Sequence, residues 1–354
     1  MTYHERREDT PPWEMGSSYP FMLPVGAGWP RSEDAVRLYG SGRQALLALL
    51  EFGKREYGWN AIHIPDYYCP EVVSDAAEVL PVSRYDVGPM ATSALVQAED
   101  QAVVVAVSYF GAPPVIPQAP PGVRTTLVID ASHDPLALWL SQIPADYVFV
   151  SLRKTMPLPD GGALWAPTSR ALPPDAPLTD AQRVATSHAL SAMCLKAAYL
   201  AGAPVEKDRY LELYAAGEAS LCGATVSGIS EYSRQALRIL AVDDMWRRRA
   251  DNGQVFAREM ESLSGVTVQV FAFGIVLECR SHSQREALRR GLIERRIYPA
   301  VLWTLPPNSP PHHYDFSQRM LFLHCDSRWN SDDMLRAAGL IRDLLTQHLE
   351  GTPC

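Results

Sequence analysis

Three short runs of almost uninterrupted apolar, β-branched residues follow one another in the first half of the chain. They are Ala102 to Ser108 (AVVVAVS), Thr126 to Asp130 (TLVID) and Tyr147 to Ser151 (YVFVS). Such runs are typical of strands that are buried on both faces of a parallel sheet. Roughly twenty residues separate successive runs, which suits crossover connections. The sequence therefore predicts an α/β domain with a mostly parallel sheet.

Neighbouring segments predict further elements of this domain. They are an apolar helix from Gly42 to Phe52 after a Gly-Ser-Gly turn, a strand from Ala61 to Ile64, a helix from Pro70 to Val79, and helical patterns from Thr179 to about Leu263. The periodicity of apolar residues and the turn residues at their ends carry these assignments.

The last third of the chain predicts a small α+β domain. Its expected elements are two strands around Gly274 within Val266 to Glu278, a helix from Ser283 to Arg296, a strand from Met320 to His324 and a closing helix from Ser331 to His348. We place the boundary near Met245, within a long amphipathic segment. This gives an N-terminal arm (residues 1–30), a large domain (31–245) and a small C-terminal domain (246–354).

Charge and apolar content argue against two kinds of partner. The formal net charge of −8 argues against a nucleic acid, because phosphate binding normally shows as a basic excess. The most apolar helical stretch, Ala189 to Ala203, contains Lys196 and is too short to span a bilayer. The six cysteines show no C-x-x-C pair and no zinc-ligand spacing, and the polar first residues do not resemble a signal peptide. We therefore expect a cytoplasmic protein with neither a nucleic-acid nor a membrane partner.

Lys154 stands just beyond the third apolar run, three residues after Ser151 and ahead of a Gly-Gly turn. On this segment alone, a surface lysine in a loop explains the position equally well. The functional alternative is an amine that forms a Schiff base with an aldehyde cofactor. Such an amine must first lose its proton, which the neighbouring cation Arg153 would favour, and Ser151 could donate to a phosphate.

Asp130 ends the second run, where open α/β sheets place their ligands. Pyridoxal 5'-phosphate (PLP) needs a carboxylate at its pyridine nitrogen, so that the protonated ring can withdraw electrons. His133 is close enough in sequence to lie over or beside the same ring. Read alone, Asp130 could instead be a helix N-cap, and His133 an ordinary loop histidine.

The segment Ser41-Gly42-Arg43-Gln44 supplies a third feature. A glycine-bearing turn that opens a helix presents free backbone N–H groups and a positive dipole end to an anion such as phosphate. It is a weak signal alone. The order of the three features along the chain, first the turn, then the strand-end aspartate and then the lysine, favours a PLP site over explanations that treat each as an ordinary structural residue.

Ser151 and Lys154 also match the S-x-x-K motif of penicillin-binding proteins and β-lactamases, in which the serine is the nucleophile. Those enzymes also need S-D-N and K-T-G elements, and neither occurs in this sequence. Their serine opens a helix, whereas Pro157 and Pro159 follow here at once. The PLP hypothesis is therefore preferred.

Together these residues resemble the DegT–StrS family of PLP-dependent aminotransferases, which act largely on nucleotide-linked keto-sugars. The matching segments are Glu14 to Ser17, Ser41 to Leu46, Ile64 to Cys69, Tyr109 to Gly111, Asp130 to His133, Tyr298-Pro299 with Trp303, and Cys325 to Trp329 before Asp333-Met334. The resemblance implies PLP-transferase fold type I, with a seven-stranded, mostly parallel sheet in the large domain.

The resemblance also implies roles for single residues. Lys154 would be the Schiff base and the proton shuttle, Asp130 the acid at the pyridine nitrogen, and His133 the residue packed on the ring. Tyr68 would lie near the ring, Ser151 would bind the phosphate with the Ser41 to Gln44 turn, and Trp303 and Arg328 would face the substrate, Arg328 as a carboxylate clamp.

Two positions depart from the family pattern. The family has a serine five residues before its lysine, against three here, and a small hydroxyl residue or alanine where this chain has Arg43. Arg43 could hold a phosphate with two bonds or reach an acidic substrate.

We therefore expect an aminotransferase that takes its amino group from a small-molecule donor and passes it to a keto acceptor. We expect a homodimer with its sites at the interface, where residues near Ser233, Arg234 or Asn252 reach the partner's cofactor. Another PLP reaction (decarboxylase, lyase or dehydratase) is the alternative, and a PLP-binding regulator or inactive relative is a third hypothesis. The reaction depends on which substrate bond stands perpendicular to the ring.

Overall fold

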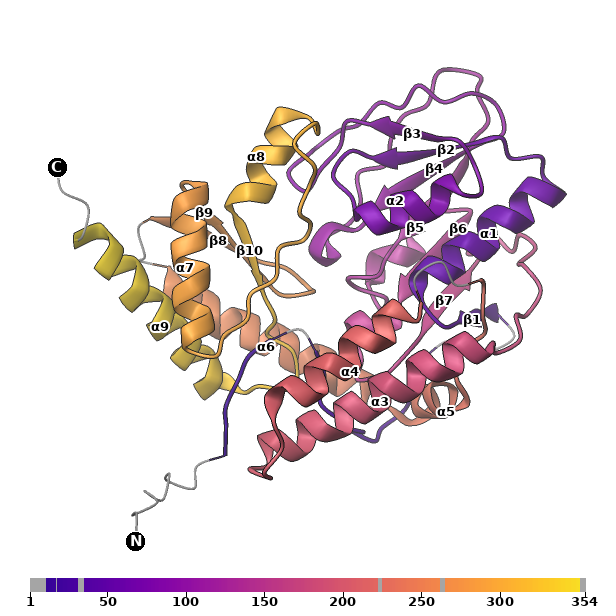
Figure 1. Cartoon of the computed structure of the whole chain (residues 1–354). Helices are drawn as coiled ribbons and strands as arrows, with labels where there is room; N and C mark the ends of the chain where they lie inside the picture. The colour runs from indigo at the N-terminus through magenta and orange to yellow at the C-terminus, as the bar shows by residue number, and fades with distance from the viewer. Residues whose placement is uncertain (1–10, 17, 31–34, 222–224, 262–264, 351–354) are drawn as a thin grey trace, which may run out of the picture.

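A computed structural model describes residues 11–16, 18–30, 35–221, 225–261 and 265–350, with side chains through residue 346. The chain forms a large domain with a central sheet and a small domain beside it, joined by one long helix (Figure 1). Ser17, which the resemblance matched to an opening loop, lies outside the described residues. No helix in the described ranges has the length and apolar character needed to cross a bilayer.

The large domain contains a seven-stranded sheet in the order β1-β7-β6-β5-β4-β2-β3. Its strands are β1 Arg37–Tyr39, β2 Ala61–Pro65, β3 Val82–Tyr85, β4 Ala102–Val107, β5 Thr126–Asp130, β6 Tyr147–Ser151 and β7 Gly162–Trp165. All neighbours pair in parallel except β7, which is antiparallel to both β6 and β1. The mostly parallel sheet that the apolar runs predict is confirmed.

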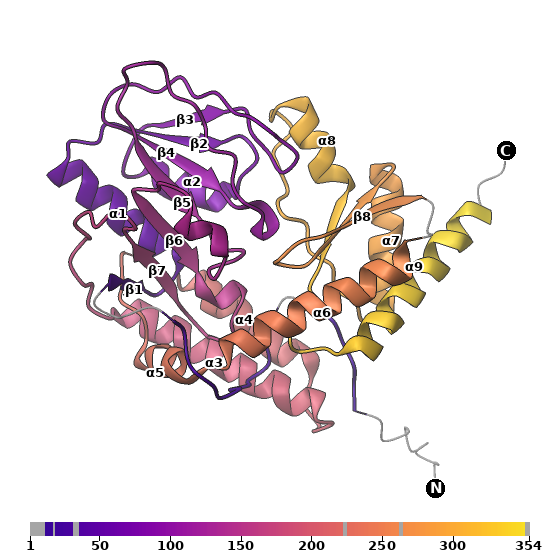
Figure 2. The ribbon, with the colours of Figure 1, turned by 180° about the vertical axis from the view of Figure 1, so that it is seen from behind.

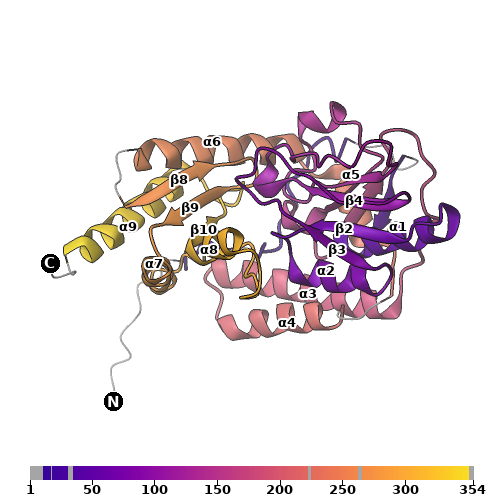
Figure 3. The same ribbon diagram turned by 90° about the horizontal axis from the view of Figure 1, so that it is seen from above.

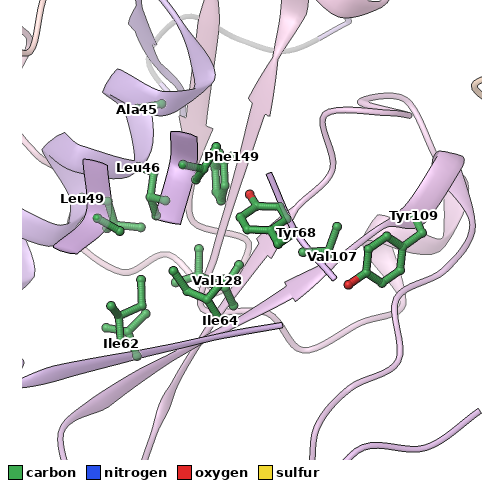
Figure 4. Packing of buried hydrophobic residues seen from close by; sticks show 14 of the residues in the cluster. Ala45, Leu46, Leu49, Ile62, Ile64, Tyr68, Val107, Tyr109, Val128 and Phe149 are labelled. Carbon is green, nitrogen blue, oxygen red and sulfur yellow. The ribbon is translucent and has the colours of Figure 1, made fainter. Parts of the chain in front are cut away.

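Side chains of the central strands alternate between two apolar cores. In β6, Tyr147 and Phe149 face the core under α1 (Gly42–Glu56) and α2 (Pro70–Ala77), which Figure 4 shows from close by. Val148 and Val150 face the opposite core, under α5 (Glu231–Ile239) and the start of α6 (Val242–Met260). Helices therefore cover both faces, which explains why these strands have no polar alternation.

The region from Thr179 to Leu263 divides into several helices. Before α5 and α6 come α3 (Asp180–Leu200) and α4 (Lys207–Ala219), which lie side by side along one edge of the large domain (Figure 3). Met245 lies inside α6, which runs from the core of the large domain into that of the small one (Figure 2).

The small domain is a three-stranded antiparallel sheet with helices around it. Its strands, in the order β10-β9-β8, are β8 Val266–Val270, β9 Ile275–Cys279 and β10 Met320–Leu323, and its further helices are α7 His282–Glu294, α8 Pro311–Arg319 and α9 Ser331–Glu350. In β9, Leu277 packs into the core with α6, α7 and α9, whereas Val276 faces the core of the large domain. The small sheet thus contacts the large domain with one face.

The connections that follow β4 and β5 are irregular. They contain only the 3-10 turns η2 (Tyr109–Gly111) and η3 (Leu138–Ser141), and a third such turn, η4 (Leu152–Lys154), follows β6. Phe110 of η2 packs against Phe271 and Phe322 of the small domain. The carboxyl ends of the parallel strands therefore meet the small sheet, which is where open α/β sheets bind ligands.

Candidate active site

A cavity of about 450 Å³ lies where the two domains meet. Its wall includes Cys69, His133 and Lys154 from the strand ends and Phe273 and Trp303 from the small domain. The α3–α4 pair adds apolar wall residues, and Ser18 and Tyr19 add part of the N-terminal segment. The cavity has the size and the mixed lining that are typical of a small-molecule site.

The Lys154 amine is placed in this cavity by η4. Its Nζ lies 5.8 Å from the centre of the Trp303 ring. Within the described part of the chain, no hydrogen bond or ion pair engages this amine. Its neighbour Arg153 forms a two-bond ion pair with Glu218 of α4, with Nη2 donating to Oε2 at 3.0 Å. Lys154 is thus an amine in a cavity wall, and its sequence neighbour Arg153 already has a carboxylate partner.

Asp130 is buried at the carboxyl end of β5, 6% exposed. The Tyr68 hydroxyl donates to Asp130 Oδ2 at 2.5 Å, and the Ser132 N–H donates to Oδ1 at 2.9 Å. Burial, followed by the Asp130 carboxylate, raises the pKa of Tyr68 well above its usual range, so Tyr68 stays protonated as the donor. Each carboxylate oxygen keeps a further lone pair for another donor.

His133 lies in a stack of flat rings at the cavity wall. Its ring centre is 4.3 Å from that of Phe273, at 8°, and 5.8 Å from that of Trp303, at 19°. Burial, and after it the Lys154 charge, lowers the pKa of His133 well below its usual value. The ring is therefore neutral, and because Nδ1 accepts the Phe110 N–H at 3.1 Å, its proton is on Nε2.

The turn at Ser41 packs against the end of β6. Ser41 Oγ caps α1 by accepting the Gln44 N–H at 3.2 Å. A Cβ on Gly42 would lie 3.0 Å from the Ser151 nitrogen, and one on Gly162 would lie 2.2 Å from the Ser41 oxygen. The start of α1 can approach the end of β6 and the start of β7 this closely only because positions 42 and 162 are both glycine.

The side chains of this turn point to protein partners. Gln44 Nε2 donates to Gln182 Oε1 at 3.3 Å, and Arg43 lies 3.4 Å from the Asp75 carboxylate. The Ser151 N–H donates to Ser132 Oγ at 2.9 Å, which ties β6 to β5. In the described part of the structure, none of Ser41 to Gln44 lies in the cavity wall.

Arg328 is buried and engaged by three acceptors. Its Nε and Nη2 donate to the two Asp326 oxygens at 2.8 and 2.7 Å, and Nη1 donates to the Ser18 oxygen at 2.8 Å. Its guanidinium also lies 4.0 Å from the centre of the Tyr19 ring. Arg328 thus holds the segment that supplies Ser18 and Tyr19 to the cavity wall.

Two of the residues named for the expected dimer interface are buried within their own chain. The Ser233 hydroxyl donates to Asp160, and the Asn252 amide donates to the Cys325, Asp326 and Trp329 carbonyls at 3.0, 3.2 and 3.0 Å. These two side chains are therefore engaged within their own chain, and the expectation that residues near them reach a partner's cofactor stays a prediction. Arg234 is half-exposed and lies 3.9 Å from Glu231.

Sequence reasoning missed much of the cavity wall. Cys69 falls within a matched segment but drew no role, and Phe273 stands beside the glycine expected between two strands. The α3–α4 wall, with Gln182, Met193 and Tyr214, carries no local signal, because helix periodicity does not reveal which cavity a helix borders.

No protein-family model matches the sequence, and no curated protein matches it. Solved structures do match its fold. Spr1654 of Streptococcus pneumoniae, assigned as a sugar aminotransferase and solved in a PMP form, is 11% identical with a TM-score of 0.62, over 96% of this chain and 99% of that one.

Two further aminotransferases show the same similarity. PseC of Helicobacter pylori, involved in pseudaminic acid biosynthesis, is 12% identical with a TM-score of 0.56, over 95% of this chain and 100% of its own. The sugar aminotransferase CalS13 of Micromonospora echinospora is 14% identical with a TM-score of 0.56, over 87% of each chain. The fold class expected from the sequence is confirmed: the chain has the fold of these sugar aminotransferases.

Proposed function

We propose that the protein is a PLP-dependent aminotransferase of the DegT–StrS type. The observation that carries the proposal is the Lys154 amine, which lines the cavity at the strand ends without an ionic partner in the described residues. Lys154 is half-buried, so its amine borders the cavity without being sealed from solvent. An amine in this position can react with an aldehyde cofactor.

The residues around Lys154 fit this cofactor. Asp130 offers a buried carboxylate with lone pairs to spare, and the neutral His133 offers a flat ring surface for a planar heterocycle. Gly42 lets the start of α1 pack directly on Ser151, because a Cβ at this position would lie 3.0 Å from the Ser151 nitrogen. Backbone N–H groups at a helix start suit a phosphate.

Bound PLP would supply an electron-withdrawing ring that stabilises negative charge on the substrate carbon bearing the amino group. Lys154 would attach the cofactor through Nζ, and its freed amine would take the proton from that carbon and return it to the cofactor side. Asp130 would hold a proton at the pyridine nitrogen. The small-domain wall with Trp303 would exclude water.

As the amino acceptor we propose a keto compound derived from a sugar, because the similar structures are sugar aminotransferases. Trp303 is the wall residue that we assign to the substrate side. Arg328 is assigned to positioning Tyr19 in the wall, because its nitrogens already have acceptors. We further propose a cytoplasmic homodimer.

A single-turnover experiment tests the reaction. Protein loaded with PLP is mixed with one amino acid at a time, without an acceptor. Transamination releases one keto acid per site and leaves the amino group on the protein, until a keto-sugar removes it. Release of carbon dioxide or free ammonia would instead show a decarboxylase or a lyase. No reaction with any common donor would refute the proposal.

A further inference from the structure

A second cluster of ligand-type side chains lies outside the cavity, where α8 of the small domain meets the large domain. It consists of Asp86, which follows β3, and His312 and His313 of α8. Asp86 Oδ1 lies 3.0 Å from His312 Nε2 and 2.9 Å from His313 Nε2. The three ligand atoms lie within 4.8 Å of one another, although 226 residues separate Asp86 from His312.

One of these histidines lacks the partner that its burial requires. His313 is 6% exposed, and its Nε2 is buried without a hydrogen bond of acceptable geometry, although it is aimed at the carboxylate. His312 already bonds the same oxygen. A buried imidazole nitrogen without a well-directed hydrogen bond is unfavourable. A cation between the three atoms would satisfy all of them.

The protein holds the ligands in place from both domains. The Val87 oxygen, next to Asp86, accepts the Tyr67 N–H at 3.3 Å. The His313 ring packs edge-on against Tyr67, 6.0 Å between centres, and occupies the space that a Cβ on Gly88 would fill, at 2.6 Å. Packing therefore fixes the His313 ring, and the backbone next to Asp86 is held by a hydrogen bond, as a specific metal site requires.

We propose that Asp86, His312 and His313 bind a divalent transition-metal ion, with Zn²⁺ as the best match. Two imidazoles and one carboxylate are a usual ligand set for zinc, with about 2.0–2.2 Å from metal to ligand and the fourth position left to water. Ligand atoms on such a tetrahedron lie about 3.3 Å apart, near the present 2.9 and 3.0 Å.

The ion would clamp the two domains together beside the cavity. Tyr67, against which His313 packs, donates its hydroxyl to the Leu302 oxygen at 2.6 Å, and Leu302 precedes the cavity residue Trp303. The site does not include Lys154 or Asp130, so the inference is independent of the proposed aminotransferase reaction.

Zinc uptake by the full-length protein tests the site. The protein is treated with a chelator, dialysed against micromolar ZnCl₂, and its zinc content per chain is measured by atomic emission. Wild type is expected to take up one Zn²⁺, and Asp86→Asn and His312→Gln to weaken binding at least ~10-fold, since even second-shell changes cost 10–100-fold. Both residues are exposed, so neither change threatens folding.

Two controls keep the result specific. Asp315→Asn removes another exposed carboxylate of α8, one that pairs with Arg319, and should bind Zn²⁺ as wild type does. Zinc should also raise the melting temperature of wild type and of Asp315→Asn but not of Asp86→Asn. Equal uptake by wild type and Asp86→Asn, or no uptake by wild type, would overturn the proposal.

Discussion

The Tyr68 hydroxyl is a donor to a buried carboxylate, and its removal is predicted to cost more than the loss of an ordinary tyrosine hydroxyl. It donates to Asp130 at 2.5 Å, and both side chains are buried. A hydrogen bond to a charged group contributes about 1.5–3 kcal/mol, against about 1 kcal/mol for a neutral pair. Burial removes the solvent screening that would otherwise reduce this value.

Tyr85→Phe is the matched control, because the Tyr85 hydroxyl is also buried but donates to a neutral acceptor, the Val105 carbonyl, at 2.6 Å. Tyr68→Phe should lower the free energy of unfolding by about 1.5–3 kcal/mol and Tyr85→Phe by about 1 kcal/mol. Urea unfolding of cofactor-free protein, followed by circular dichroism, measures both. The dependence on urea should keep its slope, so that the shift in midpoint reports stability.

A double-mutant cycle isolates the pair. Asp130→Asn in the Tyr68→Phe background should cost less than Asp130→Asn in wild type, because the hydroxyl and the carboxylate no longer interact. If Tyr68→Phe costs no more than Tyr85→Phe, or if the two changes are additive, the reasoning about a charge-assisted bond at Asp130 is refuted.

Three further predictions concern other parts of the structure. Asp326→Asn should lower the free energy of unfolding by about 3–5 kcal/mol in thermal or urea unfolding, because it leaves the buried Arg328 without its carboxylate. Burial alone would raise the pKa of Asp326, but Arg328 outweighs burial and lowers that pKa. The pair therefore stabilises the protein above about pH 4, and this stabilisation is lost as the pH falls below that value. An unchanged difference in the free energy of unfolding between wild type and Asp326→Asn from pH 6 to pH 2.5 would contradict this. Gly162→Ala should lower the melting temperature more than Gly42→Ala does. A Cβ at position 162 would lie 2.2 Å from the Ser41 backbone, whereas a Cβ at position 42 would lie 3.0 Å from Ser151. The reverse order of melting temperatures would count against the tight packing at this turn.

The central strands were predictable because burial on both faces removes polar alternation. β4, β5 and β6 are bounded almost as the apolar runs predict, and so are the strands of the small domain with α7 and α9, whereas α8 was not predicted. β1 (RLY) and β7 (GALW) gave no usable signal from the residues themselves, since three or four residues are too short for a periodicity. Their place depends on pairing partners, β7 with both β6 and β1.

The proposed site was partly predictable from the positions of these same strands. Strand ends of a parallel sheet converge, so Asp130 and Lys154 could be assigned to one region from their positions alone. Lys154, His133 and Trp303 all line the cavity. The roles proposed for them stay predictions, because position does not reveal chemistry.

Tertiary partners were beyond the sequence. Polar residues on an amphipathic helix look exposed, yet Ser233 and Asn252 turn inward to satisfy Asp160 and three carbonyls. The Tyr68–Asp130 bond joins residues 62 apart, and the histidine pair of α8 meets Asp86 across the domain boundary. No local pattern specifies such pairs.

Covalent trapping at Lys154 tests the central claim most directly. The purified protein is supplied with PLP, reduced with borohydride, digested and analysed by mass spectrometry, with Lys154→Ala as the control. The account predicts a yellow protein whose colour disappears on reduction, with the cofactor fixed to the peptide that contains Lys154, and a Lys154→Ala variant that traps nothing. A wild type that traps no cofactor, or traps it on another lysine, would contradict the account.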